Sequence, residues 1–345
     1  MIRIKNIYYM LSYAFQILNE QGYKQILTEE FDNVAELFAA ILSKGVASQI
    51  KRGLSREYIL QTEPLSTLRG KIDISASVKE QTMIKKQLVC NYDDFSVNAY
   101  LNRIIRTTMG LLVRSDISNT RKKELRKLLI FFGEVEPVEV NNINWKIRYR
   151  RNNQTYQMLI SICYLVIKGL LQTNTDGSTK LMDFLDEQRM CRLYEKFILE
   201  YYRREHSEIK AAACQIPWDT DDGYKEMLPV MQSDITLKKG KKTFVIDAKY
   251  YSHTMQKQYD VHTLHSSNLY QIYTYVKNLD KDNTGNVSGM LLYARTDELM
   301  LPDNSYLMGG NSISVKTLNL DCDFSEIRKQ LDDIAYLGFD MEVRR

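Results

Sequence analysis

Two acidic residues and a lysine lie in two neighbouring β-prone segments of the C-terminal half. Asp234 follows the segment LPVMQS, and Asp247 and Lys249 lie in TFVIDAKYY. Side chains alternate between the two faces of a strand, so Asp247 and Lys249 point the same way, about 7 Å apart. If the two segments pair as a hairpin, Asp234 comes close to Asp247. The spacing therefore predicts two carboxylates and one ammonium group at a single point.

Paired carboxylates raise each other's pKa unless a cation lies between them. Mg²⁺ suits this place, because it binds one or two carboxylates, several waters and substrate phosphate oxygens. We therefore expect Asp234 and Asp247 to be metal ligands, with the carbonyl of Ala248 as a possible third. Such a metal activates water, and Lys249 beside it can orient that water and stabilise charge on a phosphate. The alternative is a solvent-exposed strand face with a cross-strand ion pair.

Two helical segments could complete such a site. Glu195, in MCRLYEKFILEYY, shares an apolar helix face with Cys191 and Ile198. An acid on that face needs a cation or a hydrogen-bond donor, unless it only lies at the rim of the apolar stripe. Gln271 and Tyr275 are four residues apart and face one way. They could contact a phosphate or a base, although Tyr275 could equally be a core tyrosine.

The net charge of the chain is +4, but the charge is unevenly distributed. Residues 1–180 contain 26 Lys and Arg against 17 Asp and Glu, whereas residues 181–345 contain 21 against 26. This asymmetry suggests a polyanion or an acidic partner for the first half, or simply solvated helix faces. Basic side chains also occupy the expected hairpin turn, beside the expected metal, where they could bind DNA phosphates or form a solvated tip. They are Lys238, Lys239, Lys241 and Lys242.

The periodicity of apolar residues predicts two domains of α/β (α+β) class. Residues 1–175 are expected to form a mostly helical domain with short strands. Residues 180–345 are expected to form an α/β domain with a mixed central sheet flanked by helices. The polar segment QTNTDGST, residues 172–179, predicts the linker between them.

The cysteine content and hydropathy suggest a cytoplasmic protein. Five cysteines are scattered without a CxxC pair, which is typical of free thiols in a reducing compartment. The longest apolar stretch, residues 158–171, is short for a bilayer span and is interrupted by Lys168. No signal peptide is recognisable at the start. We therefore expect no association with a membrane.

The order of these motifs resembles the PD-(D/E)XK nuclease superfamily in its RecB-like form. That pattern is a helical Glu, an Asp, a D-x-K strand and a Q-x-x-x-Y helix, and the matching residues here are Glu195, Asp234, Asp247 to Lys249, and Gln271 with Tyr275. More specifically, the chain resembles the McrC family, the nuclease subunits of McrBC systems that restrict modified DNA. The similar stretches span nearly the whole chain: KNIYYMLSYAF, KGV, RGL, GKID, NRIIRTT, LPVMQSDIT, VIDAKYY and HSSNLYQ.

The resemblance implies a restriction-endonuclease-like PD-(D/E)XK fold for residues 180–345. It also implies a Mg²⁺-dependent endonuclease that cuts double-stranded methylated DNA and works only in a complex. Its first half would dock to a McrB-type AAA+ GTPase ring and stimulate it, while its second half cuts. In that site Glu195 would support the metal or Lys249, and Gln271 and Tyr275 would line it. The sequence contains no G-x(4)-G-K-[ST] motif, so GTP is expected to bind to the partner and not to this chain.

Two other functions fit parts of the same pattern. One is a RecB-like DNA nuclease that acts alone or with a helicase. The other is a non-catalytic adaptor that binds DNA and activates the motor. The intact set of Asp234, Asp247 and Lys249 argues against the adaptor, because a degenerate site would have lost one of these charges.

Overall fold

The computed structural model describes residues 2–149, 153–176, 187–250, 255–258, 261–295 and 301–339. The chain divides into two compact units, each described here by itself. The first contains Met1–Thr28 together with Asp183–Arg345, and the second contains Glu29–Met182. The expected division near residue 175 is therefore wrong for the first 28 residues, which belong to the same unit as the C-terminal half.

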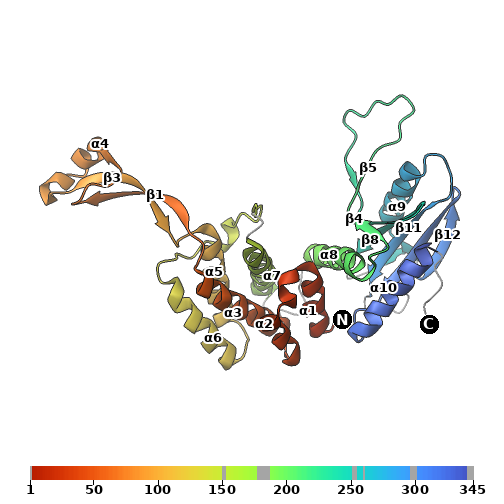
Figure 1. Cartoon of the computed structure of the whole chain (residues 1–345), viewed down its shortest axis with the longest axis horizontal. Coiled ribbons are helices and arrows are strands. Elements are labelled where there is room, and N and C mark those ends of the chain that lie inside the picture. Colours follow the sequence, from red (N-terminus) through yellow and green to blue (C-terminus); the bar gives the residue numbers. More distant parts are fainter. Residues whose placement is uncertain are drawn as a thin grey trace. The chain divides into compact units, whose positions relative to one another are not determined.

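A six-stranded mixed sheet forms the centre of the first unit, in the order β12-β13-β11-β8-β7-β4 (Figure 1). Strands β8, β11 and β13 run parallel, and the remaining three pair antiparallel with their neighbours. The expected mixed sheet is thus confirmed. The strands are β4 Lys210–Ala212, β7 Ile235–Lys239, β8 Lys242–Lys249, β11 Val287–Ala294, β12 Asn304–Met308 and β13 Asn311–Leu318. Two small hairpins accompany them, β5 Gln215–Ile216 with β6 Met231–Gln232, and β9 Met255–Gln258 with β10 Val261–Leu264.

Helices cover both faces of this sheet. Helix α9 (Ser266–Leu279) packs on one face, where a Cβ at Gly289 of β11 would lie 2.7 Å from Val276. Helix α10 (Phe324–Phe339) packs on the other face, where a Cβ at Gly338 would lie 2.2 Å from the Phe244 ring. Helix α8 (Glu187–Glu205) lies beside α10. Both glycines permit a close approach of helix and sheet that a side chain would prevent.

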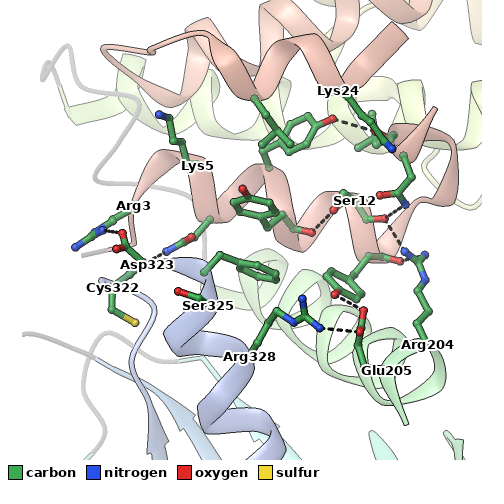
Figure 2. Close-up of a pocket in the computed structure, with 18 residues that line it drawn as sticks. Arg3, Lys5, Ser12, Lys24, Arg204, Glu205, Cys322, Asp323, Ser325 and Arg328 are labelled. Carbon is green, nitrogen blue, oxygen red and sulfur yellow. Dashed lines mark hydrogen bonds and ion pairs between the residues drawn. The ribbon is translucent and has the colours of Figure 1, made fainter. Parts of the chain in front are cut away.

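Polar contacts hold the N-terminal helix α1 (Ile4–Ala14) to α8 (Figure 2). The guanidinium of Arg204 donates to the carbonyls of Ser12 (3.1 Å) and Tyr13 (2.5 Å) at the end of α1. The Tyr13 hydroxyl donates to Glu205 at 2.7 Å. A cavity of about 830 Å³ opens between these helices. Three short helices follow α1: η1 Gln16–Asn19, α2 Gln21–Lys24 and η2 Gln25–Thr28. These long-range contacts explain why the predicted boundary failed, since local periodicity does not reveal them.

The second unit is a helical body with a β-sheet arm. Its four main helices are α3 Val34–Arg52, α5 Tyr100–Arg114, α6 Asn119–Leu129 and α7 Gln154–Asp176. Asn33 caps α3, its side chain accepting from the backbone N–H of Glu36, and Gly53 follows its end. Two 3₁₀ turns, η4 Ile130–Phe132 and η5 Val140–Asn142, lie between α6 and α7. Helix α7 includes residues 172–176, so this part of the expected linker is helical, and residues 177–179 lie outside the described residues.

The arm projects from these helices as an antiparallel sheet of order β1-β3-β2 (Figure 1). Strands β1 (Glu57–Leu65) and β3 (Leu88–Ser96) each have nine residues, so they are longer than the expected short strands. Strand β2 (Lys71–Asp73) leads into α4 (Ile74–Lys79) and the turn η3 (Thr82–Lys85). Gly70 is required before β2, because its φ is +69° and a Cβ would lie 2.3 Å from the Asn91 carbonyl.

Two further sequence expectations can be compared with the described residues. All five cysteines are free thiols in the structure. Among the described residues, no helix has both the length and the apolar character needed to cross a lipid bilayer.

Candidate active site

The predicted site residues lie at the carboxyl end of β8, where β7 and β8 pair antiparallel. Ile235 pairs with Ile246, so Asp234 and Asp247 lie next to this pair at the end of the ladder. The backbone N–H of Ala248 donates to Asp234 Oδ2 at 3.0 Å. The side chain of Asp247 is 1% exposed. The hairpin thus brings the two carboxylates together as expected.

Lys249 lies on the same face of β8 as Asp247, again as predicted. Its Nζ is 2.8 Å from Asp247 Oδ2 and donates to Gln271 Oε1 at 3.2 Å. The contact with Asp247 is an ion pair, and neither carboxylate oxygen of Asp247 has a hydrogen-bond partner among the described residues. A buried carboxylate is costly unless its charge is compensated, and the Lys249 ammonium supplies part of that compensation here.

Helix α9 supplies a second polar chain to the site. Gln271 accepts from Lys249 through Oε1 and donates through Nε2 to the Tyr275 hydroxyl at 2.8 Å. Tyr275 in turn donates to the carbonyl of Gln232 at 3.1 Å, two residues before Asp234. The Gln271 amide therefore has a fixed orientation, with its oxygen toward Lys249. This arrangement holds the ammonium group at the end of β8.

Helix α8 contributes Glu195, whose hydrogen-bond donor, Cys191, was not predicted. The Cys191 thiol donates to Glu195 Oε1 at 3.0 Å, one helical turn away. The same sulfur lies 3.7 Å from the carbonyl oxygen of Ala248. Thus Glu195 meets a donor on its own helix, and that donor also reaches the strand carrying Asp247.

Burial and mutual repulsion raise the pKa values of the site's acids. The pKa of Asp234 lies well above its ordinary value, first because of burial and then because of the charges of Asp247 and Glu195. Burial also raises the pKa of Glu195, although the Cys191 hydrogen bond and the charge of Lys249 oppose the rise. Burial, with the hydrogen bond and charge of Glu195, raises the pKa of Cys191 to about 12, so its thiol stays protonated. Crowded acids of this kind are typical of functional sites.

The donor set fits a hard divalent cation of the Mg²⁺ type. Asp234 and Asp247 would supply two carboxylates, and the Ala248 carbonyl a third oxygen, which suits an ion that keeps several waters. The observation behind this fit is Asp247, whose buried oxygens lack hydrogen-bond donors among the described residues. No cluster of three or more His, Cys, Asp and Glu side chains suited to a metal occurs in the described part of the chain. The fit therefore rests on two carboxylates and a carbonyl.

The basic turn lies elsewhere than expected. Strand β7 ends at Lys239 and strand β8 begins at Lys242, so that only Gly240 and Lys241 form the turn. This turn is at the opposite end of β8 from Asp247, about 17 Å away along the strand. The expectation that the lysines lie beside the metal is wrong. The lysines lie at the turn end of the β7–β8 hairpin, whereas Asp234 and Asp247 lie at its other end. Binding of DNA by Lys238, Lys239, Lys241 and Lys242 remains a prediction.

Two further groups of the site escaped prediction. Cys191 was recognised only as a member of the apolar face of α8, although its four-residue spacing from Glu195 was a usable signal. The Gln232 carbonyl carries no side-chain signal at all, and only the fold places it against Tyr275. All six predicted side chains do lie at this end of β8: Glu195, Asp234, Asp247, Lys249, Gln271 and Tyr275. Their chemical roles remain predictions.

Comparison with known proteins relates the chain to restriction systems. A relative from Escherichia coli (strain K12), named type IV methyl-directed restriction enzyme EcoKMcrBC, is 27% identical over 339 residues, covering 96% of this chain and 97% of the relative. Two solved structures from Thermococcus gammatolerans are also similar. A half-complex of McrB AAA+ hexamers with bound McrC has 17% identity and a TM-score of 0.46, covering 93% of this chain and 75% of that one. A McrBC complex has 19% identity and a TM-score of 0.40, covering 58% of each chain.

These two structural similarities are too low to carry an argument, so the assignment rests on the sequence. The sequence model of one family, described as McrBC 5-methylcytosine restriction system component, matches residues 4–294, which include every predicted site residue. This chain therefore belongs to the McrBC 5-methylcytosine restriction system component family.

Proposed function

We propose that this chain is the McrC-type nuclease subunit of a 5-methylcytosine-specific restriction complex. It would hydrolyse phosphodiester bonds of double-stranded methylated DNA in the presence of Mg²⁺, and would act in the cytoplasm with a GTP-hydrolysing McrB-type AAA+ ring. The family and the similarity to the E. coli restriction enzyme over 97% of its length support the proposal. The observation that carries the nuclease activity is the buried Asp247, with Asp234 and Lys249 beside it.

In this proposal the side chains divide the work of phosphodiester hydrolysis. Asp234, Asp247 and the Ala248 carbonyl would hold Mg²⁺, which supplies a lowered water pKa and charge stabilisation when bound. Lys249 would donate to the scissile phosphate or to the attacking water, since its ammonium lies at the same point. Gln271, itself fixed by Tyr275, would keep Lys249 in that position. Positioned charge of this kind contributes most where water is excluded, as it is around Asp247.

We further propose that the arm of the second unit docks to the ring. Its strands present Tyr58 and Leu60 at 74% and 68% exposure, and Tyr58 packs against Phe95 across the sheet with ring centroids 4.9 Å apart. More apolar side chains are exposed around α4 and η3, namely Ile74, Val78, Met83 and Ile84. Exposed apolar clusters mark interaction sites, because isolated soluble proteins rarely leave them uncovered.

Cleavage of a plasmid containing 5-methylcytosine tests the proposal directly. The reactions would contain Mg²⁺, with GTP or GDP, and with or without the McrB-type protein. An unmethylated plasmid and Asp247→Ala serve as controls. We expect cutting only when the partner, GTP and methylation are all present, and none with Asp247→Ala.

Each of the other outcomes selects a different function. Cutting by the chain alone would identify an autonomous RecB-like nuclease and refute the dependence on a ring. Stimulation of the partner's GTPase without any cutting, under all metal conditions, would identify a non-catalytic adaptor. Loss of both cutting and GTPase stimulation in Asp247→Ala would assign Asp247 a role in folding.

A further inference from the structure

We propose that Cys191 is a positioning residue of the nuclease site, which holds the Glu195 carboxylate and the Ala248 carbonyl in place for the cation. The proposal rests on the function proposed above, because the Ala248 carbonyl is one of the proposed metal ligands and Glu195 lies close enough for the charges of Lys249 and Asp247 to act on it. Cys191 itself would touch neither the cation nor the DNA.

The geometry places one thiol between two acceptor oxygens from different elements. Cys191 Sγ is 3.0 Å from Glu195 Oε1 on α8 and 3.7 Å from the Ala248 carbonyl on β8. The thiol has a single proton, so it makes its main hydrogen bond to Glu195 and a weaker contact to Ala248. Cys191 therefore links helix α8 to the strand that carries Asp247.

A donor at this position has a clear physical purpose. Glu195 and the Ala248 carbonyl both present negatively charged or partly negative oxygens to the Cys191 sulfur, and the thiol proton offsets part of this charge. The partly buried Glu195 also needs a partner to offset its desolvation. Nearby, Asp247 is 1% exposed, and Lys249 pairs with its Oδ2, whereas its Oδ1 has no hydrogen-bond partner among the described residues and could accept a cation.

Removal of the thiol should therefore weaken metal binding more than it affects folding. Groups that hydrogen-bond to metal ligands commonly change metal affinity by about 10-fold to 100-fold when they are removed. We expect Cys191→Ala to weaken binding roughly 10-fold, at the low end of that range. Cys191→Ser retains a donor and should stay within about threefold of the wild type, a smaller loss than for complete removal of the donor.

Direct titration of the full-length chain with Mn²⁺, followed by the electron paramagnetic resonance signal of the free ion, measures this affinity without cleavage. Cys322→Ala is the matched control, since Cys322 is also partly exposed and its thiol also donates to a backbone carbonyl, that of Asn319 at 3.3 Å. Its affinity for Mn²⁺ should equal that of the wild type. Asp247→Ala defines the binding that belongs to the site.

A double-mutant cycle with Glu195→Gln tests whether Cys191 acts through Glu195. In that background Cys191→Ala should cause a much smaller loss of affinity, because the carboxylate that the thiol holds is gone. This comparison remains informative if Cys191→Ala lowers the stability of the chain. Such a loss of stability would lower the apparent affinity in both backgrounds, whereas a loss that acts through Glu195 appears only when Glu195 is present.

The outcomes separate this inference from the proposed function. Wild-type affinity in Cys191→Ala would overturn the role of Cys191, as would an equal loss in Cys191→Ser, which would indicate packing rather than hydrogen bonding. An undiminished effect in the Glu195→Gln background would also overturn it. If the wild type did not bind Mn²⁺, or if Asp247→Ala bound it equally well, the proposed metal site would be refuted. The inference about Cys191 would then be refuted with it.

Discussion

The site at the end of β8 and the arm of the second unit depart from ordinary protein surfaces in opposite ways. At the site a carboxylate is buried at 1% exposure, whereas in the arm Leu60 is 68% exposed. A buried charge and an exposed apolar cluster each cost a folded chain something unless a ligand or partner compensates. The first arrangement suits a small cation and the second suits a protein surface. The comparison teaches that a buried charge and an exposed apolar cluster point to different proposed binding partners, a cation and a protein.

The largest predicted effect concerns Asp247. Asp247→Asn should lower the rate of DNA cleavage by on the order of 10³-fold, because it removes a charged metal ligand. The free energy of unfolding without metal should fall by about 3 kcal/mol, because the substitution takes the carboxylate away from the largely buried Lys249 ammonium. Cleavage assays and chemical denaturation measure the two quantities. A loss of cleavage no larger than the loss of folded protein would show that Asp247 is mainly structural.

Substitutions in the arm should reduce one activity, stimulation of the partner's GTPase, with little loss of stability. Tyr58→Ser with Leu60→Ser should reduce stimulation of the partner's GTPase by roughly 30-fold, the loss expected for central interface residues. Stability should change by less than about 0.5 kcal/mol, because both side chains are exposed. Leu337→Ser is the matched control, since Leu337 is an exposed leucine of α10 in the other unit, at 49% exposure. Equal losses in the arm and control variants would remove the distinction between the two regions.

Attachment of α1 can be tested independently of either function. Arg204→Ala removes two hydrogen bonds from a charged donor to the end of α1, and we expect a loss of about 3 kcal/mol in stability. The neighbouring Arg203→Ala is the control, because Arg203 is 43% exposed and its ion pair with Glu200 lies at the surface. Its cost should stay below about 1 kcal/mol. Similar losses for the two variants would indicate that α1 is not specifically held by Arg204.

Asp280 provides the smallest effect and an internal contrast with Asp247. Burial raises its pKa, but the hydrogen bonds from Thr284, Asn311 and Gly285 outweigh this and lower the pKa to about 2. In the window between the unfolded pKa of about 4 and pH 2, the unfolded chain binds more protons than the folded one. The stabilisation by Asp280 is therefore complete above pH 4 and is lost as the pH falls toward 2.

We expect this loss to amount to about 1–2 kcal/mol for the first unit. Acid denaturation of the wild type and Asp280→Ala measures it, because the difference in stability between the two should shrink across this window. A difference that is constant with pH would show that the aspartate acts by packing alone.

The sequence predicted the site better than the architecture around it. The common face of Asp247 and Lys249 followed from simple alternation along one strand. Strand β3 was missed, because LVCNYDDFS mixes polar and apolar residues without a clear period. The place of α1 was missed for a different reason. Its partners, such as Glu205 for Tyr13, lie 192 residues away, and periodicity carries no information over that distance.

The discontinuity of the first unit has a consequence for how the protein is made. Helix α1 is synthesised long before its partners, because Asn6 donates to the carbonyl of Leu320, 314 residues later. Chains emerge at about 5–20 residues per second, so α1 waits on the order of tens of seconds for its last contacts. The second unit can fold during that interval, since its residues are continuous. The first unit can therefore be completed only after residue 320 has left the ribosome, long after α1 and the whole second unit have emerged.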